Sequence, residues 1–296
     1  MRELVVVSGK GGTGKTSLAA AFASLARDNV LCDADVDAAD LHLLLQPEIR
    51  RRTDFMGGSK AVIDLKRCTS CGLCRDLCRF GAIEAEYRVD GISCEGCGVC
   101  VDLCPARAID FPIQKCGEWF ISETRLGPMV HARLGIGEEN SGKLVSCIRQ
   151  EARKLVEEQG LELIITDGPP GIGCPVIASI GGATALVLVV EPTVSGLHDM
   201  IRVIDLAGHF KAPCLLCVNK FDLNIEMTEQ LEEVARQRKM RVVGRIPFDL
   251  MFTKAMIAGK NVLEYQKDSQ IARAVQEAWD GIISSPAMNS YGIRSM

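Results

Sequence analysis

The feature that most constrains this chain is a cysteine pattern that occurs twice between residues 68 and 104. Each copy follows Cys-x-x-Cys-x-x-Cys-x-x-x-Cys, and the second lies 26 residues after the first. The flanks repeat too: Ile63-Asp64 corresponds to Val89-Asp90, and Ala82-Ile83 to Ala108-Ile109. The eight cysteines are Cys68, Cys71, Cys74, Cys78, Cys94, Cys97, Cys100 and Cys104. This spacing indicates a duplicated metal-binding module within a longer chain.

Three thiolates at this spacing surround one face of a [4Fe–4S] cluster, and the fourth ligand must come from elsewhere in the chain. Residues 58–116 resemble the bacterial 2[4Fe–4S] ferredoxins, in which the fourth cysteine of each set ligates the other cluster. The resemblance implies one cluster on Cys68, Cys71, Cys74 and Cys104, and a second on Cys78, Cys94, Cys97 and Cys100. The first copy has Arg79-Phe80 where the second has Pro105-Ala106. This difference affects the expected local turn and leaves the expected cluster ligands unchanged.

Zinc ribbons and disulfides are the alternatives for these cysteines. Structural zinc sites pair one Cys-x-x-Cys with a second pair farther along the chain, whereas a third cysteine three residues on is iron–sulfur spacing. Disulfides need an oxidising compartment, and the chain starts without a signal peptide. The sequence therefore predicts iron–sulfur clusters in a reducing cytoplasm, which also suits the 14 cysteines of the chain.

The composition limits the remaining possibilities. A chain of 296 residues that is 47% apolar can bury one large α/β core beside a small module. The net charge of −4 argues against non-specific binding to nucleic acid. No apolar run approaches the roughly 18 residues of a membrane-spanning helix.

A phosphate-binding loop opens the chain. The apolar run Leu4–Val7 predicts a buried parallel strand, Gly9–Thr16 satisfies G-x-x-x-x-G-K-[ST], and Ser17–Arg27 predicts a helix. Backbone N–H groups of such a loop bind phosphates, helped by the positive helix N-terminus. Lys15 is expected at the β- and γ-phosphates, and the Thr16 hydroxyl at Mg²⁺. The predicted loop contacts with nucleotide are Gly11, Gly12, Thr13, Gly14, Lys15, Thr16 and Ser17.

A second lysine, Lys10, stands early in this loop. The run Lys-Gly-Gly-x-Gly-Lys-Thr resembles the deviant Walker motif of the MinD/ParA/nitrogenase-iron-protein class. The resemblance implies that Lys10 crosses a homodimer interface and assists hydrolysis at the partner's nucleotide. An extra cation at the γ-phosphate would stabilise transition-state charge, as an arginine finger does. The alternative is a solvated loop lysine.

Acidic residues follow the next predicted strand, Val30–Ala34, and acidic strand ends face the ligand crevice of a parallel sheet. By resemblance this segment is switch I. The resemblance implies that Asp35 orients the attacking water and that Asp33 holds Mg²⁺ waters or Thr16.

The predicted strand Leu161–Thr166 ends in Asp167-Gly168-Pro169-Pro170-Gly171, an arrangement that resembles Walker B followed by switch II. Asp167 is expected to hold Mg²⁺ through water, and Gly171 to move its N–H onto the γ-phosphate. Cys174 lies seven residues past Asp167, as a bridging-cluster thiolate does in the nitrogenase iron protein. A half-buried structural cysteine is the alternative, because only Cys116 or Cys147 remain as second ligands.

Between these motifs, Glu118–Ile121 predicts a strand and Lys143–Gln159 an amphipathic helix. The stretches 127–132 and 137–143 are rich in glycine and polar residues, which predicts a loop with an N-cap at Asn140 or Ser141. The alternative is a conduit between nucleotide and clusters, with Lys143 as a basic contact.

The last third of the chain continues to alternate strands and helices. Ala185–Val190, Pro213–Val218 and Arg241–Ile246 predict strands, and Ser195–Phe210, Glu226–Lys239 and Gln270–Ile283 predict helices. Asn219 resembles the adenine-reading Asn of the class, and Pro247 and Asp249 are expected beside the adenine. Cys214-x-x-Cys217 is excluded as a joint chelator, because residues i and i+3 of a strand point to opposite faces.

The alternation predicts an α/β fold with a doubly wound, mostly parallel sheet. The resemblance of residues 58–116 implies that an α+β ferredoxin-like module is inserted in it. The expected segments are a P-loop domain in two parts, 1–57 and 117–285, an insertion at 58–116, and a polar tail at 286–296. Over nearly its full length the chain resembles MinD-superfamily P-loop ATPases, here with an inserted ferredoxin domain.

The resemblance implies ATP and Mg²⁺ sandwiched in a homodimer, ATP hydrolysis, and electron transfer through two [4Fe–4S] clusters to an unidentified redox protein. One alternative is an iron–sulfur cluster carrier of the Mrp type. Another is a redox-sensing positioning ATPase, although the tail is neither basic nor strongly amphipathic, unlike a MinD-type membrane anchor.

Overall fold

The structure is a computed structural model that describes residues 1–135 and 141–289. The chain forms two compact units. The sheet unit consists of the described residues of Met1–Arg52, Trp119–Arg133 and Ser141–Met296, and the cysteine unit of Thr53–Glu118 with a return segment that starts at Leu134. The boundaries lie within strands β3 and β6, a few residues from the predicted 57/58 and 116/117. The predicted domain limits stay a prediction.

Within the described residues, the sheet has nine strands in the order β11-β10-β9-β1-β8-β2-β7-β6-β3. Every pairing from β11 to β7 is parallel, as predicted for the P-loop class. The strands are β1 (Arg2–Ser8), β2 (Asn29–Asp33), β3 (Glu48–Ser59), β6 (Ile113–Thr124), β7 (Gly127–Leu134), β8 (Leu163–Pro170), β9 (Ala185–Val190), β10 (Cys214–Asn219) and β11 (Arg241–Ile246).

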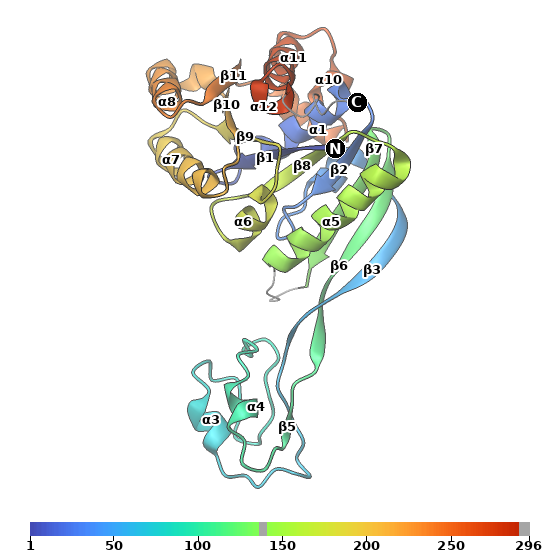
Figure 1. Ribbon diagram of the computed structural model, residues 1–296, viewed down its shortest axis with the longest axis vertical. Helices are drawn as coiled ribbons and strands as arrows, with labels where there is room; N and C mark the ends of the chain where they lie inside the picture. Colours follow the sequence, from blue (N-terminus) through green and yellow to red (C-terminus); the bar gives the residue numbers. More distant parts are fainter. Residues whose placement is uncertain (136–140, 290–296) are drawn as a thin grey trace, which may run out of the picture. The chain divides into compact units, whose positions relative to one another are not determined.

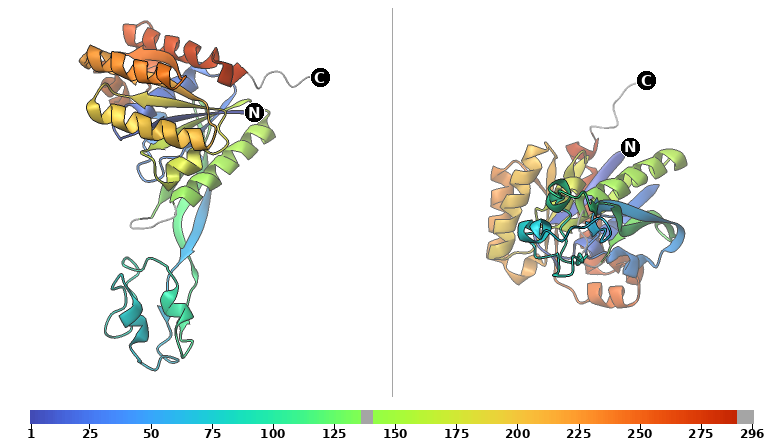
Figure 2. Two further views of the ribbon diagram at one scale, coloured as in Figure 1. Left: turned by 60° about the vertical axis from the view of Figure 1, so that its left-hand side comes forward. Right: turned by 90° about the horizontal axis from the view of Figure 1, so that it is seen from below.

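Helices cover both faces of this sheet (Figures 1 and 2). Successive residues of a strand point to opposite faces, so Leu4 and Val6 of β1 pack under α1 and α11, whereas Val5 and Val7 pack under α6, α7 and α8. The helices are α1 (Lys15–Leu25), α2 (Leu41–Leu45), α5 (Ser141–Gln159), α6 (Cys174–Ile180), α7 (Val194–His209), α8 (Ile225–Gln237), α9 (Met251–Ile257), α10 (Val262–Tyr265), α11 (Gln270–Ile283) and α12 (Pro286–Asn289), with a 3₁₀ turn at Phe221–Leu223. None of the helices in the described ranges is long and apolar enough to cross a membrane.

The stretch 127–132 differs from its prediction. It was expected to be a loop, but it forms most of strand β7, which pairs in parallel with β2. Met129 to Ala132 are buried, so the burial available beside β2 outweighs the turn signal of Gly127-Pro128. Asn140 lies outside the described residues, and Ser141 is already the first residue of α5. Lys143 is exposed on the first turn of that helix.

Arg125, in the two-residue connection between β6 and β7, anchors this hairpin to the sheet unit. Its guanidinium donates to the carbonyls of Leu44 and Leu45 in α2 at 2.8 and 3.0 Å. It also donates to Gly259 O at 3.0 Å and pairs with Glu264 at 2.6 Å. The short helix α2 therefore anchors two strands at their ends in the sheet unit. Strand β3 follows it in the chain, and β6 is attached to it through Arg125.

The cysteine unit contains β4 (Val62–Ile63), α3 (Leu73–Leu77), α4 (Val99–Asp102) and β5 (Ile109–Asp110). Its backbone repeats with the offset of the sequence. Asp64 N–H donates to Ala108 O and Asp90 N–H to Ala82 O, both at 2.8 Å. Each half is thus completed by hydrogen bonds to the other half. Left-handed glycines, Gly72 and Gly98, precede α3 and α4.

Candidate functional site

The phosphate-binding loop lies between the end of β1 and the start of α1 at Lys15. Gly12 and Gly14 have φ of +79° and +87°, which L-residues with side chains rarely adopt. A Cβ at Gly14 would also collide with the side-chain amide of Asn219. Among residues 1–135 and 141–289, no side chain caps the N-terminus of α1, so the N–H groups of its first turn remain available for an anion.

Lys15 is buried at the centre of a carboxylate cluster. Its Nζ lies 2.9 Å from Asp167 Oδ1 and 3.3 Å from Asp35 Oδ2, with the Thr16 hydroxyl at 3.5 Å. Burial opposes the charge of Lys15, but Asp167 and Asp35 outweigh it and hold the pKa of Lys15 above its ordinary value. The lysine is therefore fully charged and paired within the protein.

Asp33 organises the segment after β2. Its Oδ1 accepts the N–H of Asp35 and its Oδ2 accepts the N–H of Leu41, both at 3.2 Å. Burial, together with the Asp167 carboxylate, raises the pKa of Asp33 well above its usual range. Burial also raises the pKa of Asp35. The magnesium role of Asp33 and the water-orienting role of Asp35 stay predictions.

Two buried polar atoms in this cluster, Asp167 Oδ2 and Thr13 Oγ1, have no hydrogen-bond partner within the part of the chain that the structure describes. A buried carboxylate oxygen without a partner is costly. Hydrated Mg²⁺ prefers such oxygens, and a hydroxyl in the loop suits a phosphate oxygen. The orphaned atoms therefore fit Mg²⁺ and a nucleotide phosphate.

Lys10 and Gly171 both contact neighbouring strand ends. Lys10 Nζ lies 3.3 Å from Glu191 Oε2, directly after β9, so it is paired rather than simply solvated. Gly171 has φ of +89° and donates its N–H to Ser8 O at 2.9 Å, a bond that must break before this N–H can reach a phosphate. The sequence motifs did not indicate Glu191.

An open cleft adjoins the loop. The residues that line it are Gly12, Gly14, Ser17, Asn219, Lys220, Pro247, Phe248, Asp249, Phe252, Thr253 and Met256. The predicted adenine-side residues thus lie together. Asn219, however, donates to Thr13 O at 2.7 Å and accepts from Lys220 N–H, so its amide also braces the loop.

Helix α9 contributes a wall of this cleft that sequence patterns did not indicate, formed by Phe252, Thr253 and Met256. Phe248 and Met256 are each nearly half exposed. Large apolar side chains exposed beside a cleft are a signal of ligand binding.

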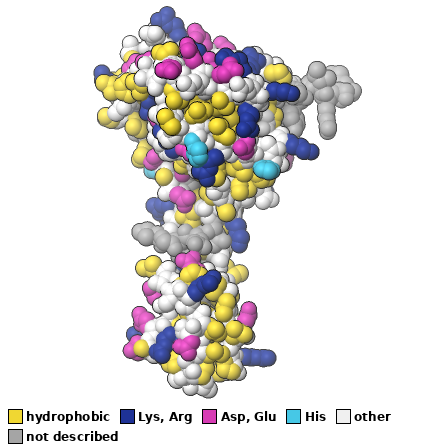
Figure 3. Space-filling view, turned by 90° about the vertical axis from the view of Figure 1, so that its left-hand side faces the viewer, with side chains coloured by type: hydrophobic (Ala, Val, Ile, Leu, Met, Phe, Trp, Pro, Cys, Tyr) yellow, Lys and Arg dark blue, Asp and Glu magenta, His cyan; other side chains and the backbone are white. Residues whose placement is uncertain are grey.

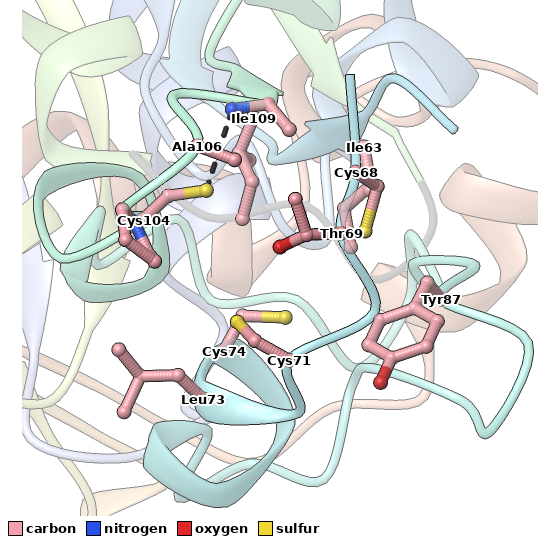
Figure 4. A pocket seen from close by; sticks show the side chains of 12 residues that line it. Ile63, Cys68, Thr69, Cys71, Leu73, Cys74, Tyr87, Cys104, Ala106 and Ile109 are labelled. Atoms are coloured by element: carbon pink, nitrogen blue, oxygen red, sulfur yellow. Dashed lines mark hydrogen bonds between the residues drawn. The ribbon is translucent and has the colours of Figure 1, made fainter. Parts of the chain in front are cut away.

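In the cysteine unit, Cys68, Cys71, Cys74 and Cys104 line one cavity (Figure 4). The other lining residues are Ile63, Thr69, Leu73, Tyr87, Pro105, Ala106, Ala108 and Ile109. Ala108 N–H donates to Cys104 Sγ at 3.3 Å, the dashed line in Figure 4, and Ser70 N–H donates to Cys68 Sγ at 3.4 Å. The cavity thus joins three cysteines of the first set to the fourth of the second.

Across residues 1–135 and 141–289, no three His, Cys, Asp or Glu side chains form a group that could hold a metal ion. Three cysteines of the second set, Cys94, Cys97 and Cys100, lie near one another. Burial, then the neighbouring thiolates of Cys94 and Cys97, raise the pKa of Cys100, and Cys74 of the first set adds to this effect. Cys78 directly follows α3. Ligation of clusters by either set stays a prediction.

The remaining cysteines are distributed over the sheet unit and its borders. Cys174 is exposed at the start of α6, Cys116 is buried, and Cys147 is half-buried on α5. A bridging role for Cys174 stays a prediction. On β10, Cys217 belongs to the core under α1 and α11, whereas Cys214 packs into the opposite core, as predicted for i and i+3 of a strand.

A sequence profile of the family described as CbiA, the CobQ/CobB/MinD/ParA nucleotide binding domain, matches residues 4–262. An uncharacterized protein of Methanocaldococcus jannaschii is 31% identical over 94% of this chain and 95% of its own length. An uncharacterized ATP-binding protein of the same organism is 24% identical over 93% of this chain and 84% of its own length.

Solved structures with similar folds include two archaeal proteins. The septum site-determining protein MinD of Pyrococcus horikoshii, complexed with Mg-ADP, has a TM-score of 0.59 at 18% identity, covering 96% of each chain. The cell division ATPase MinD of Pyrococcus furiosus has a TM-score of 0.58 at 18% identity, covering 95% of this chain and 98% of that one. At this identity the similarity concerns the fold, and it confirms the predicted P-loop sheet architecture.

Proposed function

The chain belongs to the CobQ/CobB/MinD/ParA nucleotide-binding family, and we propose that it is an ATPase whose nucleotide state controls electron transfer through two [4Fe–4S] clusters. The observation that carries the redox half is the cavity lined by Cys68, Cys71, Cys74 and Cys104. These four lining cysteines are the set that the resemblance assigns to one cluster, although Cys104 lies in the other half of the repeat.

The nucleotide half rests on the loop and its orphaned atoms. Backbone N–H groups at the start of α1, the cation of Lys15 and the free Asp167 Oδ2 suit the phosphates and Mg²⁺ of ATP. The complex of the similar Pyrococcus horikoshii protein with Mg-ADP supports this choice. When phosphates arrive, Lys15 exchanges its carboxylate partners for phosphate oxygens.

Hydrolysis follows from that exchange. Released from Lys15, Asp35 orients a water molecule in line with the γ-phosphorus, and Asp167 holds the magnesium-bound water. The attacking oxygen bonds to phosphorus as the bond to the β–γ bridging oxygen breaks. The protons of the water pass to oxygens of the phosphate that forms and from there to solvent, which yields ADP and phosphate. Lys10 of a second copy adds positive charge at the γ-phosphate, so the active form is a homodimer.

A zinc ion and a cluster make different demands on four cysteines, and the third cysteine three residues after the second favours a cluster here. Four thiolates on one zinc ion at 2.3 Å would lie about 3.8 Å apart. In a [4Fe–4S] cluster each thiolate binds a different iron, so the cysteines surround a larger space. An apolar lining and N–H donors to sulfur are the surroundings that tune such clusters, which supply one-electron transfer when bound.

Two measurements on anaerobically purified protein test the proposal. Iron analysis should give about eight irons per chain, with an S = 1/2 resonance after dithionite. Stopped-flow reduction of a low-potential acceptor should then be faster with MgATP than without. Zinc in place of iron would overturn the redox half, and equal rates with and without MgATP would overturn the coupling.

A cluster carrier is the second candidate, and the exposure of Cys71 and Cys97 favours it. A thiolate at the surface can be approached by an acceptor protein. Incubation with an iron-free ferredoxin separates the two functions, because a carrier transfers iron to it and an electron-transfer protein retains its own.

A further inference from the structure

Glu191 occupies a central place at the carboxyl edge of the sheet. It directly follows β9, and the sheet order β10-β9-β1 sets this strand end between two others. The phosphate-binding loop follows β1, and Asn219-Lys220 ends and follows β10. Ligands of parallel sheets bind at this edge, so Glu191 stands between the two halves of the nucleotide site.

One carboxylate here pairs with two lysines. Glu191 Oε2 lies 3.3 Å from Lys10 Nζ, and Glu191 Oε1 pairs with Lys220 Nζ. The Glu191 side chain is 15% exposed, against 33% for Lys10 and 29% for Lys220, so this is not a pair of freely solvated groups. Lys220 Nζ also reaches Gly12 O at 3.4 Å.

Within the described residues, the ammonium of Lys10 faces three acceptors of its own chain. An ammonium has three N–H donors. The acceptors around Lys10 are Glu191 Oε2, the Thr193 hydroxyl at 3.4 Å and the Ser195 hydroxyl at 3.5 Å. A lysine satisfied within its own chain must leave these partners before it can reach a phosphate of another chain.

We propose that Glu191 is a latch that holds Lys10 within its own subunit and releases it when a second copy with bound nucleotide docks. The proposal rests on the function of Lys10 in the homodimer proposed above. Lys220 makes the release reversible, because it keeps the mostly buried Glu191 carboxylate paired after Lys10 has left. Glu191 is thus a positioning residue that acts through Lys10.

The test replaces the carboxylate by an amide of the same shape, in Glu191→Gln. ATP turnover is measured over a range of protein concentrations, with the affinity for a fluorescent ATP analogue measured in parallel. At concentrations where the native protein is mostly monomeric, we expect turnover to rise about two- to fivefold, the effect of losing a partly exposed ion pair. The two proteins should converge at high concentration, with equal nucleotide affinity.

Two further variants make the result specific. In Lys10→Ala/Glu191→Gln the gain should vanish, because the latch acts only through Lys10. Glu162→Gln removes the same charge from an exposed pair with Arg2 and should leave turnover unchanged. A rise in turnover in the Lys10→Ala background, slower turnover in Glu191→Gln, or a lost nucleotide affinity would each overturn the latch.

Failure of the latch is distinguishable from failure of the proposed function. If Lys10→Ala alone leaves turnover at the native level, the function of Lys10 is wrong and the latch falls with it. If Lys10→Ala slows turnover while Glu191→Gln leaves its concentration dependence unchanged, only the latch is wrong.

Discussion

The sheet unit and the cysteine unit are stabilised in different ways. Strands β1, β8 and β9 of the sheet unit are buried along nearly their whole length under helices on both faces. In the described cysteine unit, α3 and α4 contain no buried residue. Exposed large apolar side chains of this unit include Leu65, Leu73, Leu77, Phe80, Ile92, Val99 and Leu103. Figure 3 shows hydrophobic side chains in yellow on one face of the molecule.

The difference indicates what holds each unit together. Burial of apolar side chains is sufficient to stabilise the folded sheet unit. A unit the size of Thr53–Glu118 rarely obtains enough stability from its core, and small natural domains add disulfides or metals. All described cysteines are free thiols. We therefore expect bound clusters to supply much of the folding free energy of the cysteine unit.

Removal of iron should produce the largest difference in stability between the two units. Replacing Cys68, Cys71 and Cys74 together by Ser, or chelating the iron, should unfold Thr53–Glu118 while the sheet unit stays folded. Hydrogen exchange resolved along the sequence measures both units in one sample. Cys147→Ser is the matched control, and protection of Thr53–Glu118 that persists without iron would contradict the comparison.

Truncation of an apolar side chain should have the next largest effect, and it should destabilise the two units by different amounts. Ile165→Ala, in the fully buried strand β8, should cost about 2–5 kcal/mol of unfolding free energy through lost burial and a cavity. Ile92→Ala in the cysteine unit, where Ile92 is 79% exposed, should change stability by less than about 0.5 kcal/mol. Denaturant unfolding of the iron-loaded protein measures both. A similar cost for the two changes would show that the cysteine unit has a conventional core.

Loss of nucleotide binding should leave the cysteine unit intact. Lys15→Met removes the buried cation from Asp35 and Asp167 and is expected to weaken ATP binding about 100-fold. Calorimetric titration with MgATP measures the affinity, and iron content should stay at the native level. Iron lost from this variant would mean that the two units depend on each other to fold.

The stability of the sheet unit should also depend on pH through a histidine of its own. Burial, then His42, lowers the pKa of His131 in β7 from 6.5 to about 4, and its Nε2 lies 2.9 Å from the Ser122 hydroxyl. A lowered pKa means that the unfolded chain binds more protons, so stability is complete above pH 6.5 and falls as the pH drops toward 4. The loss should be about 2–3 kcal/mol.

The buried carboxyls of Asp33 and Asp35 have the opposite effect in the same range, since their pKa values are raised. The difference between native protein and His131→Gln therefore isolates the histidine. Thermal unfolding of both proteins at several pH values measures it, and parallel stability curves would exclude His131 as the source.

Local sequence signals predicted most of the sheet unit. The bounds predicted for Ala185–Val190 and Gln270–Ile283 agree with β9 and α11 residue for residue. An unbroken apolar run and a strongly amphipathic repeat, respectively, leave little room for another structure. The predicted loop residues and strand-end carboxylates meet around Lys15 because parallel strands end at one edge.

Contacts between distant segments were not predictable in this way. Gly127-Pro128 indicates a turn locally, and only pairing with β2 makes β7 a strand. Glu191 follows a strand without any motif, and its two lysines come from 181 residues before it and 29 after it. Helix α9 forms a wall of the cleft only because of how it packs against the rest of the sheet unit. A local sequence pattern does not predict this packing.

The anchoring of α2 has a consequence for how such a protein is assembled. Asp33 holds the first turn of α2 through Leu41 N–H, and Arg125 holds its last carbonyls. The attachment of β3 and β6 is thus built from residues of the sheet unit, and Asp33 connects it to Asp35 beside Lys15. Any module inserted between these two strands would be joined to the sheet unit at the same anchored point, whatever its own sequence.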